Sequence, residues 1–272
     1  MKRRILMGAV ALSMLLPAGM VLAQDLPALA VKDKYKVGFA KTESNNPWRI
    51  AQTKSFQDTA ATCGWDLVLT DAGGSAAKQV ADVDSMIAQG IDVLFLPPRE
   101  ESPLIPAVMR AKGAGIPTFL VDRSVDPNVA QAGRDYVSFL GSDFIDQGGR
   151  AADWLIKNFK GDKGVIVELE GTTGSSPAND RKKGFDDAVA ADARFSIVAS
   201  RSGDFARDEG RKVMETLLQA HPDVNVVYAH NDEMAIGAIQ ALEAAGRKPG
   251  EDVTVVSIDG TRDALQAIID GK

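Results

Sequence analysis

The stretch from Val226 to Gly260, VVYAHNDEMAIGAIQALEAAGRKPGEDVTVVSIDG, decides the fold. Two apolar runs, Val224–Tyr228 and Val253–Ile258, flank a stretch of helical periodicity over Asp232–Ala245. Gly246 follows the helical stretch, where a left-handed cap suits glycine. The apolar runs lack polar alternation, which is typical of strands buried on both faces, and this strand–helix–strand order predicts a parallel sheet.

The same alternation runs through the rest of the chain. The other expected strands are Lys36–Ala40, Leu67–Thr70, Val93–Leu96, Thr118–Val121, Val137–Leu140, Val165–Leu169 and Ser196–Ala199. The other expected helices are Pro47–Ala61, Ala76–Gln89, Ser102–Ala114, Ile145–Lys157, Asp180–Ala191, Ala206–Gln219 and Arg262–Asp270. A repeated strand–helix order with a parallel sheet defines an α/β fold.

Nine strands are too many for one ordinary open sheet of this wound type, so we expect two wound parallel-sheet lobes joined by a hinge. The rhythm breaks near Leu140–Asp143, where one strand follows another through the loop 125–135 without a helix between them. We therefore place an N-terminal lobe at 24–141 and a C-terminal lobe at 142–272.

The N-terminus predicts export. Lys2, Arg3 and Arg4 precede an apolar run, Ile5–Val21, and small residues end at Ala23. This order is that of a secretory signal peptide over residues 1–23, and it predicts an exported protein whose mature chain begins near Gln24. A membrane anchor is the alternative, but the run is near the lower limit for a span, and a proline and a glycine interrupt it.

Composition excludes several classes of partner. Removal of residues 1–23 takes away three positive charges, so the formal charge changes from −6 to −9. A net-acidic chain with scattered charges lacks the basic footprint of a nucleic-acid-binding protein. Cys63 is the single cysteine, and we expect it to be a buried apolar filler at a helix end before Gly64.

Polar and aromatic residues follow the strands at the ends where wound parallel sheets bind ligands. The candidates for ligand binding are Asn45, Trp48, Arg49, Asp122, Arg123, Arg181, Phe205, Asn231 and Asp259. Carboxylate and guanidinium groups pair with neighbouring hydroxyls, and aromatic faces cover the apolar side of a sugar ring. This set suits a neutral polyol.

Each candidate also has a structural interpretation. Asp122 and Arg123 could form a solvated ion pair, and Trp48 could be a core residue. Asn231 could serve only to cap the following helix, since asparagine is common there. Asp259 with its following glycine could be an ordinary turn. Their shared position at strand ends favours the binding interpretation.

No sequence signal indicates catalysis. The two histidines, His221 and His230, lack a serine or cysteine nucleophile motif beside them. No phosphate loop, metal-spaced cluster or nucleophile elbow is present in the sequence. The sequence therefore predicts no enzyme, no metal and no cofactor.

The chain resembles the sugar-binding proteins of the ribose-binding type, the type I periplasmic binding proteins, and within them the galactofuranose-binding type. The segments that carry this likeness are PTFLVDRSVD (117–126), IVELEGTTG (166–174), NDRKKGF (179–185), SGDFARDEG (202–210), VVYAHNDEMAIGAIQAL (226–242) and SIDGTRDALQAIIDGK (257–272). The resemblance implies that Asp122 and Arg123 contact sugar hydroxyls in the first lobe. It implies the same role in the second lobe for Arg181, Phe205, Asn231 and Asp259.

The pair Trp48–Arg49 stands where the ribose type has two aromatic residues, and it resembles the galactofuranose type. Asn45 replaces an acidic residue of that type. Ribose, another pentose or a hexopyranose therefore stay open as ligands.

The resemblance implies a receptor whose lobes close on a monosaccharide and which then docks, as a monomer, on the inner-membrane permease of an ABC importer. It also implies a further C-terminal stretch beyond Lys272, with one more strand, a ligand residue and a return to the first lobe. Two other classes are the effector domain of a repressor, which would carry a DNA-binding helix-turn-helix and no export signal, and a sugar-modifying enzyme using Asp122 and Asp259.

Overall fold

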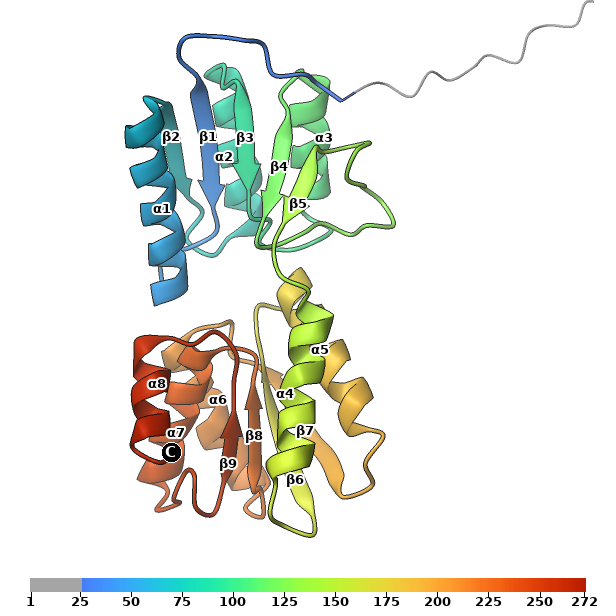
Figure 1. Cartoon of the computed structure of the whole chain (residues 1–272), viewed down its shortest axis with the longest axis vertical. Helices are drawn as coiled ribbons and strands as arrows, with labels where there is room; N and C mark the ends of the chain where they lie inside the picture. Colours follow the sequence, from blue (N-terminus) through green and yellow to red (C-terminus); the bar gives the residue numbers. More distant parts are fainter. Residues whose placement is uncertain (1–25) are drawn as a thin grey trace, which may run out of the picture.

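The computed structural model describes residues 26–272, and the expected signal peptide (1–23) lies outside the described residues. Residues 26–272 form two parallel sheets with eight helices, stacked end to end along the long axis of the molecule (Figure 1). The predicted α/β class with two wound sheets is confirmed. None of the helices among residues 26–272 is long and apolar enough to cross a membrane.

The first sheet and its helices are here called the first lobe. Its elements are β1 (Lys36–Lys41), α1 (Pro47–Cys63), β2 (Asp66–Asp71), α2 (Ala76–Ala88), β3 (Val93–Leu96), α3 (Ile105–Gly113), β4 (Thr118–Val121) and β5 (Ser138–Leu140). The strand order is β2-β1-β3-β4-β5, and every neighbouring pair is parallel. Because β1 lies between β2 and β3, the connections run in opposite directions from it, and ligands bind at such a switch point.

The second sheet and its helices are the second lobe. Its elements are α4 (Phe144–Asn158), β6 (Gly164–Glu170), α5 (Ser176–Val189), β7 (Phe195–Ser202), α6 (Arg207–Ala220), β8 (Val226–Ala229), α7 (Asp232–Ala244), β9 (Thr254–Val256) and α8 (Arg262–Ile269). The order β7-β6-β8-β9 is again all parallel, with the switch point between β6 and β8.

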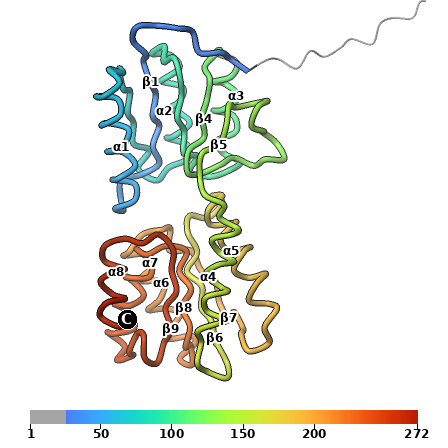
Figure 2. The backbone as a smooth tube through the Cα atoms, in the orientation of Figure 1, coloured from blue at the N-terminus to red at the C-terminus, as the bar shows by residue number. Residues whose placement is uncertain are grey.

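The chain passes from the first sheet to the second between β5 and α4, and no second passage occurs within residues 26–272. The backbone tube shows this single connection between the lobes (Figure 2). The expected C-terminal stretch concerns residues beyond Lys272 and stays a prediction.

Two predictions about local structure are wrong. α5 begins at Ser176, four residues before the predicted helix start, because Pro177 in the first turn is suited to a helix start. Arg181 therefore lies in the second turn of the helix rather than in its first. Cys63 does end α1, before a left-handed Gly64, but it is exposed rather than buried.

Candidate functional site

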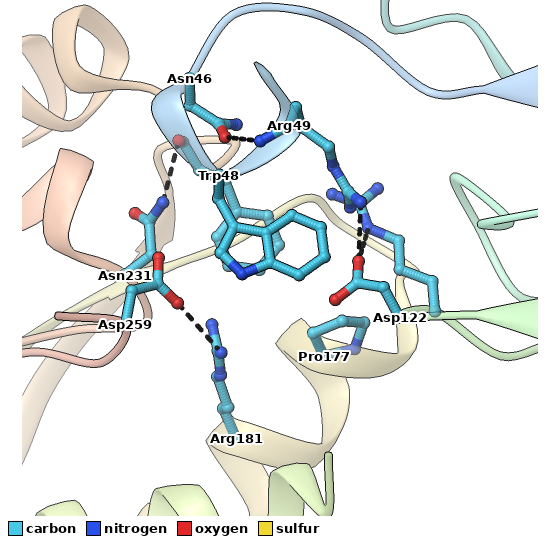
Figure 3. Close-up of a pocket in the computed structure, with 10 residues that line it drawn as sticks. Asn46, Trp48, Arg49, Asp122, Pro177, Arg181, Asn231 and Asp259 are labelled. Atoms are coloured by element: carbon cyan, nitrogen blue, oxygen red, sulfur yellow. Dashed lines mark hydrogen bonds and ion pairs between the residues drawn. The ribbon is translucent and has the colours of Figure 1, made fainter. Parts of the chain in front are cut away.

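A cavity lies between the facing ends of the two lobes, and residues from both lobes line it (Figure 3). The lining residues are Asn46, Trp48, Arg49, Asp122, Arg123, Pro177, Arg181, Phe205, Asn231 and Asp259. They follow the carboxyl ends of several strands or stand in the helices that begin there.

The start of α1 positions Trp48 and Arg49. Asn46 is the N-cap, and its side-chain oxygen accepts a hydrogen bond from the Arg49 amide at 2.9 Å. Pro47 has the fixed φ that suits the first helical position. The cap holds the first turn over the cavity, so that Trp48 stays 40% exposed while Arg49 is 4% exposed. The Arg49 guanidinium lies 4.9 Å from the centre of the indole ring.

The end of β4 supplies Asp122 and Arg123. Asp122 Oδ2 pairs with Arg49 Nη1 at 2.7 Å, as the dashed line in Figure 3 shows. Arg123 is 1% exposed, and its Nε has no hydrogen-bond partner among the described residues. Burial, together with the charge of Arg49, lowers the pKa of Arg123 to about 9, so the guanidinium stays cationic at neutral pH. A buried cation with an unused donor is ready to bind a ligand oxygen.

Arg181 is the corresponding cation of the second lobe. Its Nη1 donates to the His230 carbonyl at 2.6 Å, and its Nη2 pairs with Asp259 Oδ1 at 3.4 Å. His230 is buried, with Nδ1 accepting from the Gly171 amide at 3.2 Å and Nε2 lying 2.9 Å from Glu168 Oε1. These contacts of His230 fix the end of β8 in place. The carbonyl that accepts from Arg181 is therefore fixed as well.

Phe205 forms an apolar wall of the cavity. The guanidinium groups of Arg123 and Arg181 lie 5.5 and 5.9 Å from its ring centre, within cation–π distance. The ring packs so closely on Gly171 that a Cβ there would be 1.9 Å from a ring carbon. Glycine at 171 is therefore required for this placement of the phenylalanine.

Backbone strain concentrates at the cavity. Four non-glycine residues of the described chain have positive φ: Asp122, Asp204, Phe205 and Asp259. Three of them line the cavity, and the fourth precedes Phe205. Such conformations cost about 1–3 kcal/mol each and persist where the surrounding structure holds them, often at binding sites.

The charges of the cavity are balanced. Its lining has three arginines and two aspartates, and the buried Glu43 stands directly behind two of the arginines. Burial raises the pKa of the Asp259 carboxyl to about 6; Asp232 and Asp122 add to the rise, and Arg181 opposes it. Balanced charges with this many donors and acceptors favour an uncharged, hydroxyl-rich ligand.

Of the nine residues named from the sequence, eight line this cavity and Asn45 does not. Asn45 is exposed, and its side-chain oxygen accepts from the amide of Asn46, which lines the cavity instead. Trp48 is not a core residue, because it is partly exposed. Arg123 does not form a solvated ion pair, because it is buried. Asn231 does cap α7, accepting from the Met234 amide at 3.1 Å, and it lines the cavity as well.

Four residues at or beside the cavity were not among the candidates from the sequence: Asn46 and Pro177, which line it, and Glu43 and Arg99, which stand behind it. Pro177 lines the cavity from the first turn of α5. Glu43 and Arg99 stand just beyond the ends of β1 and β3. The rule that ligand-site residues follow the carboxyl ends of strands would have found both. It had to be applied to the two residues after β1 and to the residues after β3. Among residues 26–272 no group of three histidine, cysteine or acidic side chains is arranged to hold a metal ion.

Comparison with known proteins finds relatives that are sugar-binding proteins. The family model described as a periplasmic binding protein domain matches residues 37–272. The galactofuranose-binding protein YtfQ of Escherichia coli is 39% identical over 250 residues, which cover 91% of this chain and 78% of the relative. The ribose import binding protein RbsB of Bacillus subtilis is 35% identical, covering 89% and 75%.

Solved structures agree with these relatives. The crystal structure of a galactofuranose binding protein matches with a TM-score of 0.83 and 40% identity, over 87% of this chain and 80% of that chain. The arabinose ABC transporter component of Shewanella sp. ANA-3, bound to α- and β-L-arabinofuranose, matches with a TM-score of 0.81 and 36% identity, covering 87% and 78%.

Proposed function

Because the chain belongs to the family of periplasmic binding proteins, we propose that it is the receptor of a sugar ABC importer and captures a monosaccharide between its two lobes. It is a binding protein and not an enzyme, as its relatives are binding components of importers. The signal peptide delivers it to the periplasm. Residues 24–141 and 142–272 are the two lobes.

The observation that carries this proposal is the composition of the cavity. Arginines and aspartates from both lobes face one small space, with Trp48 and Phe205 as apolar walls. Paired charged groups bind neighbouring hydroxyls, and aromatic faces cover the C–H side of a ring. The balance of charge favours a neutral sugar over a sugar acid or phosphate.

We propose a furanose as the bound ring form, with galactofuranose or a related sugar as the ligand. Galactofuranose and arabinofuranose appear in the names of similar proteins. The pair Trp48–Arg49 supports a ligand with a hydroxylated chain outside the ring, because a guanidinium can donate to that chain. Ribose is the alternative.

The closed receptor then docks on the permease as a monomer. Contacts from both lobes give the sugar a higher affinity for the closed form, and this difference drives closure. No covalent step is involved.

Calorimetric titration of the mature protein with D-galactose, L-arabinose, D-ribose and D-glucose tests the ligand class. Carbon NMR of bound, anomerically labelled galactose distinguishes a furanose from a pyranose ring. Asp122→Ala and Arg123→Ala are each expected to weaken binding by about 2 kcal/mol or more, because each leaves buried groups without partners. Near-normal affinity in either variant contradicts the site assignment, and failure of all four sugars to bind contradicts the function.

A further inference from the structure

Glu43 is a buried carboxylate that stands behind the cavity rather than in it. It lies two residues beyond the end of β1, at the switch point between β1 and β3, and is 5% exposed. It is not among the residues that line the cavity. A buried carboxylate is costly unless it is paired, so its partners explain its presence.

Three arginines of the first lobe converge on this carboxylate. Glu43 Oε1 accepts from Arg49 Nε at 3.2 Å and from Arg123 Nη2 at 3.3 Å. Glu43 Oε2 accepts from Arg99 Nη1 at 2.6 Å. Arg49 and Arg123 both line the cavity, whereas Arg99 does not.

Arg99 reaches across the cleft. Its Nη2 donates to both carboxylate oxygens of Asp204 in the second lobe, at 2.9 and 3.0 Å. Its backbone is held in the first lobe, because the Arg99 amide donates to Gln79 Oε1 at 2.8 Å and its carbonyl accepts from Arg123 Nη1 at 3.1 Å. The guanidinium therefore joins a fixed first-lobe carboxylate to a second-lobe carboxylate only when the lobes are together.

Other hydrogen bonds also join the lobes, but among residues 26–272 none of them involves Glu43 or one of its three arginines. The Glu101 amide donates to the Gly174 carbonyl at 2.9 Å, and the Ser124 amide donates to Ser176 Oγ at 2.8 Å. The Arg99–Asp204 pair is distinct because it shares Glu43 with two arginines that line the cavity.

Electrostatics makes this arrangement depend on Glu43. Burial raises the pKa of the Glu43 carboxyl, but the charges of Arg123, Arg49 and Arg99 more than offset this, so the pKa is lowered and the group is ionised. Without this negative charge the three guanidinium groups would repel one another in a poorly solvated space.

We propose that Glu43 is a positioning residue that couples sugar binding to lobe closure. It orients the two cavity-lining arginines and also the arginine that engages Asp204. The inference has two parts. The effect of Glu43 on sugar binding rests on the proposed function, and its effect on lobe closure, here called the closure half, rests on the geometry of the cleft. One carboxylate thus sets both the shape of the binding surface and the stability of the closed form.

Distance measurement by double electron–electron resonance tests the closure half without any sugar. Spin labels are placed on the native exposed Cys63 of α1 and on Lys183→Cys of α5, whose lysine side chain is 61% exposed. In the ligand-free protein, Glu43→Gln is expected to increase the population at long distance. Asp204→Asn, which affects only the cross-lobe pair, is expected to produce a smaller increase.

Sugar binding is measured on the same variants with D-galactose and L-arabinose, by calorimetry and by stopped-flow dissociation. Glu43→Gln is expected to weaken affinity about tenfold or more, mainly through faster dissociation. Asp204→Asn is expected to weaken it about three- to fivefold, since its side chain is 42% exposed. In the double variant the two effects should be less than additive, because Glu43 acts on closure through Arg99.

Asp135→Asn is the matched control. Asp135 is also a buried first-lobe carboxylate with two cationic partners, Lys112 and Arg134, but it does not line the cavity. This variant should lose stability without changing distances or affinity. Glu43→Asp, which keeps the charge, should recover part of the affinity lost in Glu43→Gln.

The proposal is overturned if Glu43→Gln lowers the melting temperature as Asp135→Asn does but leaves the ligand-free distances unchanged. The coupling is also contradicted if Glu43→Gln and Asp204→Asn weaken affinity additively in the double variant. Failure of the wild-type protein to bind either sugar contradicts the proposed function, and the ligand-free distances then still decide whether Glu43 controls closure.

Discussion

At the scale of single residues, Asp259 makes ligand binding sensitive to pH. Its side chain is 12% exposed, and burial raises its pKa to about 6. The ionised carboxylate accepts hydrogen bonds from sugar hydroxyls, whereas the protonated form loses acceptor capacity. Protons therefore compete with the sugar below pH 6, and affinity should fall about tenfold between pH 7 and pH 5.

Calorimetry across this pH range measures the effect. Asp259→Asn is the control, because an amide does not titrate and its lower affinity should be independent of pH. An unchanged wild-type affinity down to pH 5 would show that Asp259 does not bind the ligand through its ionised form.

Arg49 is expected to set the preference for ligand size. Arg49→Phe removes the donor that we propose reaches a hydroxylated chain outside the sugar ring, so the ratio of affinities should shift from D-galactose toward D-ribose. Total affinity should also fall, because the arginine pairs with both Glu43 and Asp122. The measurement is the ratio of the two dissociation constants, and an unchanged ratio argues against this role.

At the scale of elements, the close packing of α4 on α5 places Arg181. A Cβ on Gly148 of α4 would be 2.2 Å from the Arg181 carbonyl oxygen and 2.9 Å from the Phe185 amide nitrogen. Backbone cannot yield as a flexible side chain does, so Gly148→Ala must push the helices apart. We expect a loss of about 2 kcal/mol or more in the free energy of unfolding, together with weaker sugar binding.

Gly113→Ala is the control for this change. Gly113 ends α3, and an added Cβ there meets nothing within 4 Å. Alanine in a helix is favoured over glycine, so stability should be unchanged or rise by up to about 1 kcal/mol. Chemical denaturation measures both variants, and equal stabilities would mean that the α4–α5 contact adjusts freely.

At the scale of the whole molecule, two lobes joined by one connection within the described residues are suited to hinge motion. A saturating monosaccharide ligand should reduce the radius of gyration, because the lobes then stay closed on it. Small-angle scattering with and without the sugar measures this, with sucrose at equal concentration as the control. A radius that stays constant while calorimetry shows binding contradicts closure as the response to the ligand.

The amino-acid order by itself determined the α/β class, the two sheets and most of the residues around the cavity. Uninterrupted apolar runs between amphipathic stretches specify buried parallel strands with connecting helices, and parallel strands place their carboxyl ends at one edge. The residues following those ends, such as Asp122, Asn231 and Asp259, could therefore be identified without knowing how the chain packs.

Only the tertiary structure decided which of these residues pair and which neighbours support them. The Arg99–Asp204 contact joins residues 105 positions apart, and no local pattern encodes the direction of either side chain. Asn46 lines the cavity instead of Asn45 because the helix cap at α1 directs one of two adjacent amides inward. Glu43 contacts three arginines because the ends of separate strands lie beside it. The closeness of these strand ends is a property of the folded sheet.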